Sequence, residues 1–339
     1  MAGAVSVVVE HLSRGGVVLY RKVAVLAVGF CLLSGWAFGR TLRVCLDFFP
    51  NPNHVPLYLA IVDGLFEARG LDVELIVPAN PSDPVKLAAA RTIDVALTPQ
   101  INYLVARSAG LPLVAIGALI DRNLGGLLAL GDSGIGEIGD LAGRRIGYSL
   151  APLEPILWET MLRCAGVPID EVELINVGYA TVASLLAGSV DAIGAFRNFE
   201  PIQVELQGES SVFFPQEEHC IPLTYDIILV VNPDLVEERT GDLRLLLEAL
   251  SEAIAFTQAD PEGAFGRFVA ANPDLGDELN RRSFAATVSL FASGLRHDDE
   301  AVWETLQGYL VEQELMAAAL PMRELYTAAL LDLNEEESQ

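Results

Sequence analysis

Short apolar runs alternate with amphipathic segments from residue 41 onward. The segment at 55–70 has helical spacing and ends at Gly70, and Ser82 with Pro84 provides the start of another helix. Strands that alternate with helices of this length favour parallel pairing in an α/β sheet. The first series predicts strands at 42–48, 71–77, 93–99 and 111–120.

The same pattern restarts after a polar, glycine-rich stretch at 131–143 and gives way to helices after residue 231. We expect two α/β lobes, the second inserted into the first, with crossings at about 129–131 and 222–226. The C-terminal helices should then pack back on lobe 1. The predicted division is 40–129 plus 226–330 for lobe 1, 130–225 for lobe 2 and 331–339 for an acidic tail. The second series predicts strands at 144–149, 172–177, 190–196 and 225–231, and helices near 242–260, 261–271, 277–292 and 298–315.

The N-terminus is typical of a secretory signal. Arg14, Arg21 and Lys22 precede an uncharged apolar run at 23–33, and Ala37 and Gly39 are small residues at the positions a signal peptidase reads. An uncleaved membrane anchor is the alternative, but the uncharged stretch at 23–39 is at the short limit for a span. We therefore expect residues 1–39 to be removed and the mature protein to be periplasmic or secreted.

Charge and cysteine content exclude several classes of function. The chain has a formal net charge of −25, and without residues 1–39 it keeps 18 basic against 45 acidic residues, a net charge near −27. Such a surface repels phosphate backbones, so we expect no nucleic-acid partner. Cys45, Cys164 and Cys220 remain after cleavage, and an odd count without a CxxC spacing argues against a disulfide framework or a zinc site.

Four polar segments follow predicted strands. In open α/β sheets ligands bind beyond the carboxyl ends of the strands, so these segments should face one crevice. The opening segment, DFFPNPNH, is the richest because it combines two aromatic rings with amides and an imidazole. The four segments are 47–54, 98–100, 147–149 and 196–200.

Two short motifs have better structural explanations than chemical ones. Gly134 to Gly139 match the G-x-G-x-x-G pattern, but the next strand begins only five residues later, which leaves no helix to hold a pyrophosphate. Gly131 to Gly134 read GDSG, which is similar to the sequence around a serine-protease nucleophile. No oxyanion hole or suitable scaffold accompanies it. A glycine-rich turn between the lobes explains both.

His54 and Glu200 are the candidate polar side chains of the crevice. His54 has no His, Cys, Asp or Glu at i+3 or i+4, so we expect no metal and interpret it as a hydrogen-bonding wall. Glu200 lies in the first turn of a predicted helix, where it either complements the helix dipole or accepts from an amino group on a heterocycle. His219 beside Cys220 is interpreted as a loop pair without chemistry.

Several long stretches resemble one family. LDFFPNPNHVPLYLAIVDGLFEARGLDVEL, PANPSDPVKLAAARTIDVALTPQ, IGAFRNFEPIQVE and LNRRSFAATVSLF are similar to bacterial substrate-binding proteins for thiamine pyrimidine precursors, relatives of the yeast-type thiamine pyrimidine synthase. The resemblance covers about 41–330, and PNPNH with AFRNFE carries most of its specificity. It implies a two-lobed periplasmic binding fold of type 2 that captures hydroxymethylpyrimidine or formylaminopyrimidine for an ABC permease. We expect a monomer without a cofactor.

The resemblance also implies roles for individual residues. Phe48 and Phe49 would pack against the pyrimidine face, and Glu200 would accept from the 4-amino group. An apolar slot with a few convergent polar groups suits a small flat ligand. The complete set of predicted ligand-binding residues is Phe48, Phe49, Asn53, His54, Gln100, Tyr148, Asn198, Glu200, Tyr225 and Asp226.

Two other functions remain open. The enzyme branch of the family implies a single-turnover synthase that uses pyridoxal phosphate and its own histidine, but Ile61 stands at the position of its lysine and only Cys220 lies near its cysteine cluster. Capture of sulfonates or taurine would favour basic residues in the crevice, where Arg197 is the one obvious candidate.

Overall fold

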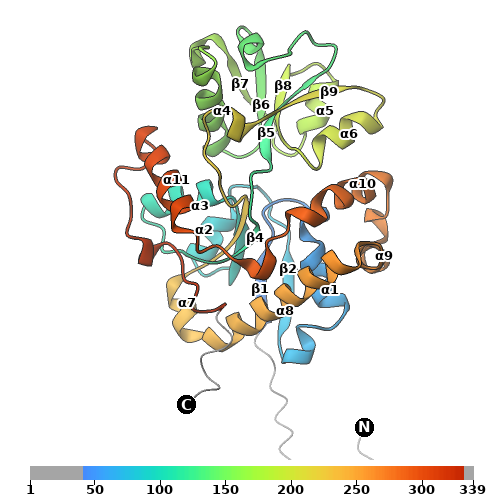
Figure 1. Ribbon diagram of the computed structural model, residues 1–339, viewed down its shortest axis with the longest axis vertical. Helices are drawn as coiled ribbons and strands as arrows, with labels where there is room; N and C mark the ends of the chain where they lie inside the picture. Colours follow the sequence, from blue (N-terminus) through green and yellow to red (C-terminus); the bar gives the residue numbers. More distant parts are fainter. Residues whose placement is uncertain (1–40, 332–339) are drawn as a thin grey trace, which may run out of the picture. The chain divides into compact units, whose positions relative to one another are not determined.

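The computed structural model describes residues 41–331, which form two five-stranded sheets (Figure 1). The predicted signal at 1–39 and most of the acidic tail at 331–339 lie outside this range. The strand order is β2-β1-β3-β10-β4 in the first sheet and β7-β6-β8-β5-β9 in the second. The strands are β1 (Thr41–Cys45), β2 (Asp72–Ile76), β3 (Val95–Thr98), β4 (Val114–Ile120), β5 (Gly125–Leu130), β6 (Arg145–Tyr148), β7 (Glu173–Asn176), β8 (Ala192–Phe196), β9 (Ser211–Pro215) and β10 (Ile227–Val231).

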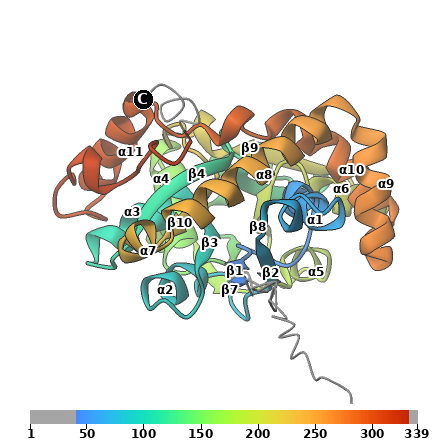
Figure 2. The ribbon, with the colours of Figure 1, turned by 90° about the horizontal axis from the view of Figure 1, so that it is seen from below.

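Helices accompany both sheets. In the second half of the molecule, defined as residues 125–215, they are α4 (Leu153–Cys164), α5 (Thr181–Leu186) and α6 (Glu200–Leu206). In the first half, which comprises 41–120 and 227–331, α1, α8 and α9 pack against one another (Figure 2). Within the described residues, no helix is both long and apolar enough to cross a bilayer. The helices of the first half are α1 (Val55–Val62), α2 (Pro84–Ala89), α3 (Gln100–Ser108), α7 (Pro233–Glu238), α8 (Thr240–Ala259), α9 (Pro261–Ala271), α10 (Glu278–Thr287) and α11 (Glu300–Glu312).

Each sheet contains one strand that opposes the parallel pattern. β10 is antiparallel to β3 and β4, and β5 is antiparallel to β8 and β9. The pairs Ile227–Ile120 and Gly125–Phe196 show that each of these strands starts beside the carboxyl end of a neighbour. The chain thus changes sheets at the carboxyl edge, and the strand that follows each crossing has to run away from that edge.

The first crossing lies earlier in the chain than expected. We predicted it at about 129–131, but β4 ends at Ile120 and β5 already pairs with β8 from Gly125. Gly126 explains why the pattern hid this strand, because a Cβ there would lie 2.3 Å from the Phe214 carbonyl oxygen. Glycine weakens a strand signal where another backbone approaches closely. The strand β9 was not predicted either, whereas the return crossing lies between Pro215 and Ile227, around the predicted 222–226.

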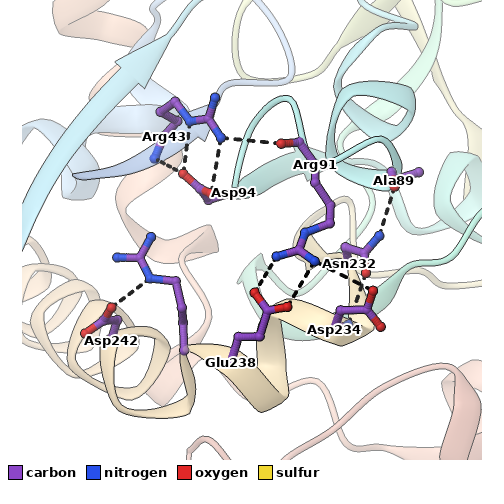
Figure 3. Close-up of polar contacts among 9 residues, drawn as sticks. Arg43, Ala89, Arg91, Asp94, Asn232, Asp234, Glu238 and Asp242 are labelled. Carbon is purple, nitrogen blue, oxygen red and sulfur yellow. Dashed lines mark hydrogen bonds and ion pairs between the residues drawn. The ribbon is translucent and has the colours of Figure 1, made fainter. Parts of the chain in front are cut away.

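Each half contains an arginine–aspartate contact of the same geometry. In the first half, Asp94 Oδ2 accepts from the Arg43 backbone N–H at 2.8 Å and from its Nε at 3.2 Å (Figure 3). In the second half, Asp191 Oδ2 accepts from the Arg145 backbone N–H at 2.9 Å and from its Nε at 3.0 Å. In each half, the aspartate just before β3 or β8 thereby holds the neighbouring parallel strand, β1 or β6.

A surface network attaches α7 to the turn between α2 and β3. Arg91 forms ion pairs with Glu238 and Asp234, and the Asn232 side chain donates to the Ala89 carbonyl oxygen at 2.9 Å (Figure 3). The Asn232 side-chain oxygen also accepts from the Asp234 N–H at 3.0 Å, which caps the helix. Exposed pairs of this kind contribute at most about 1 kcal/mol each.

The expectation of no disulfide was wrong. Cys164, at the end of α4, is bonded to Cys220 in the loop before β10, with an S–S distance of 1.99 Å and a Cα–Cα distance of 6.1 Å. The two cysteines are 56 residues apart, so no local spacing indicated the pair. Closing a loop of that length restricts the unfolded chain and contributes about 4 kcal/mol in the chain-entropy account. Cys45 is a free, buried thiol.

The last two long helices contact both halves. We expected the C-terminal helices to pack on the first half, as α8 and α9 do against α1. Arg282 of α10 also forms an ion pair with Glu205 of α6 at 2.6 Å, and Tyr309 of α11 donates to Thr160 of α4 at 2.8 Å. These contacts bridge the halves on either side of the crossing strands.

Candidate ligand-binding site

One cavity is lined by residues of both halves. It holds about 90 Å³ of space open to a water-sized molecule, against the roughly 10–15 Å³ that one water needs. Each of the four strand-end segments predicted to face one crevice contributes to its wall. They contribute Asp47, Phe48, Asn51 and Asn53 from the first, Pro99 from the second, Ser149 from the third, and Phe196, Phe199 and Glu200 from the fourth.

The wall from the first half is a loop held by its own hydrogen bonds. The His54 imidazole is fully buried, with Nε2 2.8 Å from Asp47 Oδ1 and Nδ1 3.2 Å from the Asn51 backbone nitrogen. Because the Asn51 N–H has to donate, Nδ1 is the acceptor and Nε2 carries the hydrogen that bonds Asp47. The Asn51 side chain accepts from the Asn53 N–H at 2.9 Å, which closes the turn.

Aromatic rings from both halves meet beside this loop. The ring centroids of Phe48 and Phe49 are 4.4 Å apart, and Tyr179, from the second half, lies edge-on to Phe48 at 4.7 Å. Phe199 approaches Phe49 at 5.9 Å. The Tyr179 hydroxyl donates to the Pro78 carbonyl oxygen of the first half at 3.1 Å. The cluster therefore joins the two halves at the edge of the cavity.

Glu200 is a buried acid at the start of α6. Its side chain is 7% exposed, and Oε2 accepts from the Phe196 N–H at 2.7 Å. Burial raises its pKa to about 7, although the Phe196 and Glu200 N–H groups favour the charged form, and nearby Glu154 raises it slightly more. A carboxyl group in this state changes its charge near neutral pH.

Glu154 is a second acid in the cavity, which sequence reasoning missed. It lies in the first turn of α4 and accepts from the Ser149 N–H at 2.7 Å and from the Ser149 hydroxyl at 3.0 Å. Burial raises its pKa, against the lowering effect of the Ser149 and Leu150 hydrogen bonds. The signal was present, because Glu154 and Glu200 occupy the same place: the first turn of the helix that follows a strand-end segment.

Asp226 lines the cavity but also fixes the crossing. Its Oδ2 accepts from the backbone N–H of Leu124 and from that of Gly125, the latter at 3.1 Å. Burial raises its pKa to about 6, assisted by Asp47 and opposed by these two N–H groups and by Arg197. Asp226 thus joins the start of β10 to the start of β5.

Four of the ten predicted binding residues line the cavity, namely Phe48, Asn53, Glu200 and Asp226. The other six lie outside its lining and make contacts elsewhere, so a direct role in binding stays a prediction for each. Phe49 packs against Phe48, and His54 is hydrogen-bonded to Asp47. Tyr148 packs, half-buried, against the hydrophobic core. The remaining three are Gln100, Asn198 and Tyr225.

These three side chains hold backbone or bridge elements. The Gln100 side-chain oxygen accepts from the Tyr225 N–H at 2.9 Å, and the Tyr225 hydroxyl accepts from the Asp299 N–H at 3.2 Å. Asn198 donates to Asn53 Oδ1 and to Thr287 Oγ1, both at 2.7 Å. They support the wall of the site rather than forming its surface.

The basic candidate for an anionic ligand does not line the cavity. Arg197 forms an ion pair with Glu217. None of the cavity-lining residues found within 41–331 is Arg or Lys. Across the same range no three His, Cys, Asp or Glu side chains are grouped as metal ligands. The polar groups of the cavity are acids, amides, hydroxyls and the Trp158 indole N–H, and the acids suit a ligand with N–H donors.

The fold is the α/β, two-lobed fold of periplasmic binding proteins. The alkanesulfonate-binding protein SsuA from Xanthomonas axonopodis pv. citri, solved with bound MOPS, superposes with a TM-score of 0.69 at 16% identity over 85% of this chain and 98% of that one. At this identity the likeness concerns the fold alone. It confirms the fold class expected from the sequence.

The family profile described as NMT1/THI5 like matches residues 51–264, and the chain belongs to that family. A protein of Haemophilus influenzae named for thiamine biosynthesis is 36% identical over 84% of this chain and 90% of its own length. A formylaminopyrimidine-binding protein of Halalkalibacterium halodurans is 33% identical over 66% of this chain and 68% of its own. A 4-amino-5-hydroxymethyl-2-methylpyrimidine phosphate synthase of Saccharomyces cerevisiae is 24% identical over 78% of this chain and 80% of its own.

Proposed function

We propose that this protein is the periplasmic substrate-binding component of an ABC importer and that it captures a thiamine pyrimidine precursor of the hydroxymethylpyrimidine or formylaminopyrimidine type. The observation that carries the proposal is Glu200, a buried carboxyl group that lines the same cavity as Phe48. A 4-aminopyrimidine offers an amino group to the carboxyl group and a flat face to the ring. Apolar walls with few polar groups orient such a ligand.

Lobe closure provides the signal to the permease. The cavity takes residues from both halves, so a ligand that contacts both walls favours the closed arrangement by its differential affinity. The Tyr179–Pro78 hydrogen bond and the Asn198–Asn53 hydrogen bond are contacts between the halves that opening would break. Binding of one ligand molecule would thus favour the closed form, which docks on the permease.

Two chemical features support the proposed periplasmic location. The disulfide Cys164–Cys220 is typical of proteins in an oxidising compartment such as the periplasm. The sequence at 1–39 has the features of a secretory signal, with Gly39 as the proposed last residue removed. Reduction of the disulfide in the cytoplasm would lower the stability of the fold, because the bond restricts the unfolded chain.

The synthase alternative has weaker support from the residues present. Ile61 is 40% exposed at the end of α1 and has no amine with which to hold an aldehyde. Cys220 is bonded to Cys164, and His54 is fully buried against Asp47. The synthase relative is also the more distant one, at 24% identity.

Isothermal calorimetry with a panel of pyrimidines tests the proposal. The wild-type protein should bind a 4-amino-2-methylpyrimidine carrying a 5-hydroxymethyl or 5-formylaminomethyl group. Glu200→Ala should weaken that binding about 10- to 100-fold, because it removes a buried hydrogen-bond acceptor. Glu209→Ala, an exposed acid just after the same helix, is the matched control and should leave the affinity unchanged. Absence of binding to every thiamine-related pyrimidine contradicts the proposal.

A further inference from the structure

The cavity has a second polar group of side chains that the proposed function leaves unused. Glu154 and Trp158 both line it, and both lie on α4. Residues four apart are neighbours on one face of a helix, so the carboxyl group and the indole ring lie side by side. We refer to this pair as the α4 subsite.

The α4 subsite is built against β8. Gly194 of β8 has no side chain, and a Cβ placed there would lie 2.6 Å from Trp158 Cζ2 and 3.0 Å from Glu154 Oε2. The glycine therefore lets both side chains approach the strand that leads, two residues later, to Phe196 and its hydrogen bond with Glu200. The α4 subsite and Glu200 consequently belong to one continuous wall.

The indole nitrogen of Trp158 lacks a hydrogen-bond partner among the described residues. The side chain is 2% exposed, and Nε1 is buried without an acceptor. Cζ2, which is two bonds from Nε1, is the atom that faces Gly194, so the donor lies close to the strand that lines the cavity. A buried, unpaired N–H group is unfavourable, and a ligand acceptor would satisfy it.

Glu154 supplies the complementary function. Its two oxygens accept from Ser149 at 2.7 and 3.0 Å, and the Leu150 N–H is a third donor, whereas a carboxylate has about four acceptor sites. The pair thus presents a donor at Trp158 and acceptor capacity at Glu154. Leu150, Leu153 and Leu157 line the same cavity and provide apolar surface.

We propose that the α4 subsite recognises a secondary amide on the pyrimidine substituent, with the Trp158 N–H donating to its carbonyl oxygen and Glu154 accepting from its N–H. This inference rests on the proposed function and narrows its substrate class to acylaminomethyl pyrimidines, such as the formylaminomethyl compound. A hydroxymethyl group has only one oxygen atom and reaches both residues less well. Glu200 hydrogen-bonds the amino group of the ring, and the α4 subsite hydrogen-bonds the substituent.

Binding of three probes to Trp158→Phe and Glu154→Gln tests the inference. The probes are the formylaminomethyl, hydroxymethyl and 5-methyl forms of 4-amino-2-methylpyrimidine. Wild-type protein should bind the formylaminomethyl form most tightly. Trp158→Phe, which keeps the ring volume, should weaken that form about tenfold and the 5-methyl form less than about twofold. Glu154→Gln should show the same pattern with a loss of at least about threefold.

Matched controls come from elsewhere in the chain. Trp303→Phe removes an indole N–H that donates to His297 outside the cavity lining, and Glu159→Gln changes an exposed acid on α4. Both should leave all three affinities unchanged. Thermal unfolding of each variant checks that it is folded. The indole N–H resonance of Trp158, assigned by its loss in Trp158→Phe, should shift downfield only with the formylaminomethyl probe.

The outcomes separate the two proposals. Equal losses for the formylaminomethyl and 5-methyl probes, or no loss with either variant, would overturn the α4 subsite and leave the pyrimidine function standing. Tighter wild-type binding of the hydroxymethyl form would overturn the amide class. A wild-type protein that binds none of the three probes would overturn the proposed function and the α4 subsite together.

Discussion

The two walls of the cavity use their acidic side chains in opposite ways. Asp47, on the wall from the first half, is bonded to a buried histidine side chain at 2.8 Å. Glu200 and Glu154, on the wall from the second half, accept from backbone and serine groups at helix starts and form no ion pair within residues 41–331. The acid of the first wall is therefore paired within the protein. The acids of the second wall have acceptor sites left for a ligand.

This difference predicts opposite effects of mutation. A change on the first wall should reduce the free energy of unfolding, since it breaks an interlocked set of bonds. Neutralising an acid on the second wall should increase stability while it reduces affinity. Functional sites commonly sacrifice stability in this way.

His54→Ala should have the largest effect. Removal of the imidazole leaves the Asp47 carboxyl group and the Asn51 N–H buried without their partner. Loss of one member of a buried pair costs about 3–5 kcal/mol, which urea unfolding would measure.

The double variant Asp47→Asn with His54→Ala is the control for that prediction. An unpartnered amide costs less to bury than an unpartnered carboxylate, so the double variant should recover part of the lost stability. If His54→Ala unfolds at the same urea concentration as wild type, the first wall is not held by this pair.

Glu200→Gln should stabilise the protein at alkaline pH. The pKa of Glu200 is raised from its ordinary 4.5 to about 7, so the buried acid is neutral in the folded protein at low pH and its contribution to stability is lost as pH rises from about 4.5 through 7. The wild-type penalty at pH 8 is then up to roughly 3 kcal/mol. Thermal unfolding at pH 8 should show a higher Tm for Glu200→Gln, and at pH 4.5 the difference should vanish. An equal difference at both pH values would show that charge burial is not the cause.

The affinity for an aminopyrimidine should rise with pH in the same range. A charged carboxylate accepts from an amino group more strongly than a neutral acid does. Binding should therefore strengthen about three- to tenfold between pH 5.5 and 8 as Glu200 ionises near 7. Calorimetry on Glu200→Gln, whose side chain does not titrate, should give a clearly smaller slope, with the remainder due to Asp226, whose pKa of about 6 lies in the same range. A slope equal to that of the wild-type protein would assign the titration to another group.

Tyr179→Phe should have the smallest effect, because it removes one hydrogen bond between the two walls. The hydroxyl donates to Pro78, while the ring contact with Phe48 stays in place. Stability should fall by about 1 kcal/mol or less, and ligand dissociation in stopped-flow measurements should accelerate a few-fold. Unchanged stability and an unchanged dissociation rate would mean that the rings, and not the hydroxyl, join the halves.

The sequence predicted which chain segments form the cavity better than it predicted which side chains line it. All four strand-end segments reach the cavity, because parallel strands present their carboxyl ends at the same edge. Individual side chains were less predictable, and His54, Asn198 and Gln100 are turned toward neighbouring chain segments instead. Whether a polar side chain faces a cavity or a backbone depends on partners distant in sequence.

Glu154 and Trp158 show the reverse case. The position of Glu154 in the first turn of its helix was a local signal, but nothing in the pattern of that amphipathic helix distinguishes Trp158 from an ordinary core residue. Their exposure to the cavity results from Gly194, about 40 positions downstream, which lets α4 approach β8 closely. The disulfide between Cys164 and Cys220 is hidden in the same manner.

The alternation of apolar and polar positions by itself determined the α/β class, most strands and the C-terminal helices, because burial of one face imposes a period on each element. Tertiary structure alone decided the first crossing at 121–124, the disulfide and the choice of acids that face the cavity. These features depend on close approach between segments far apart in the chain. A local pattern records the burial of a residue but not the identity of the atoms that bury it.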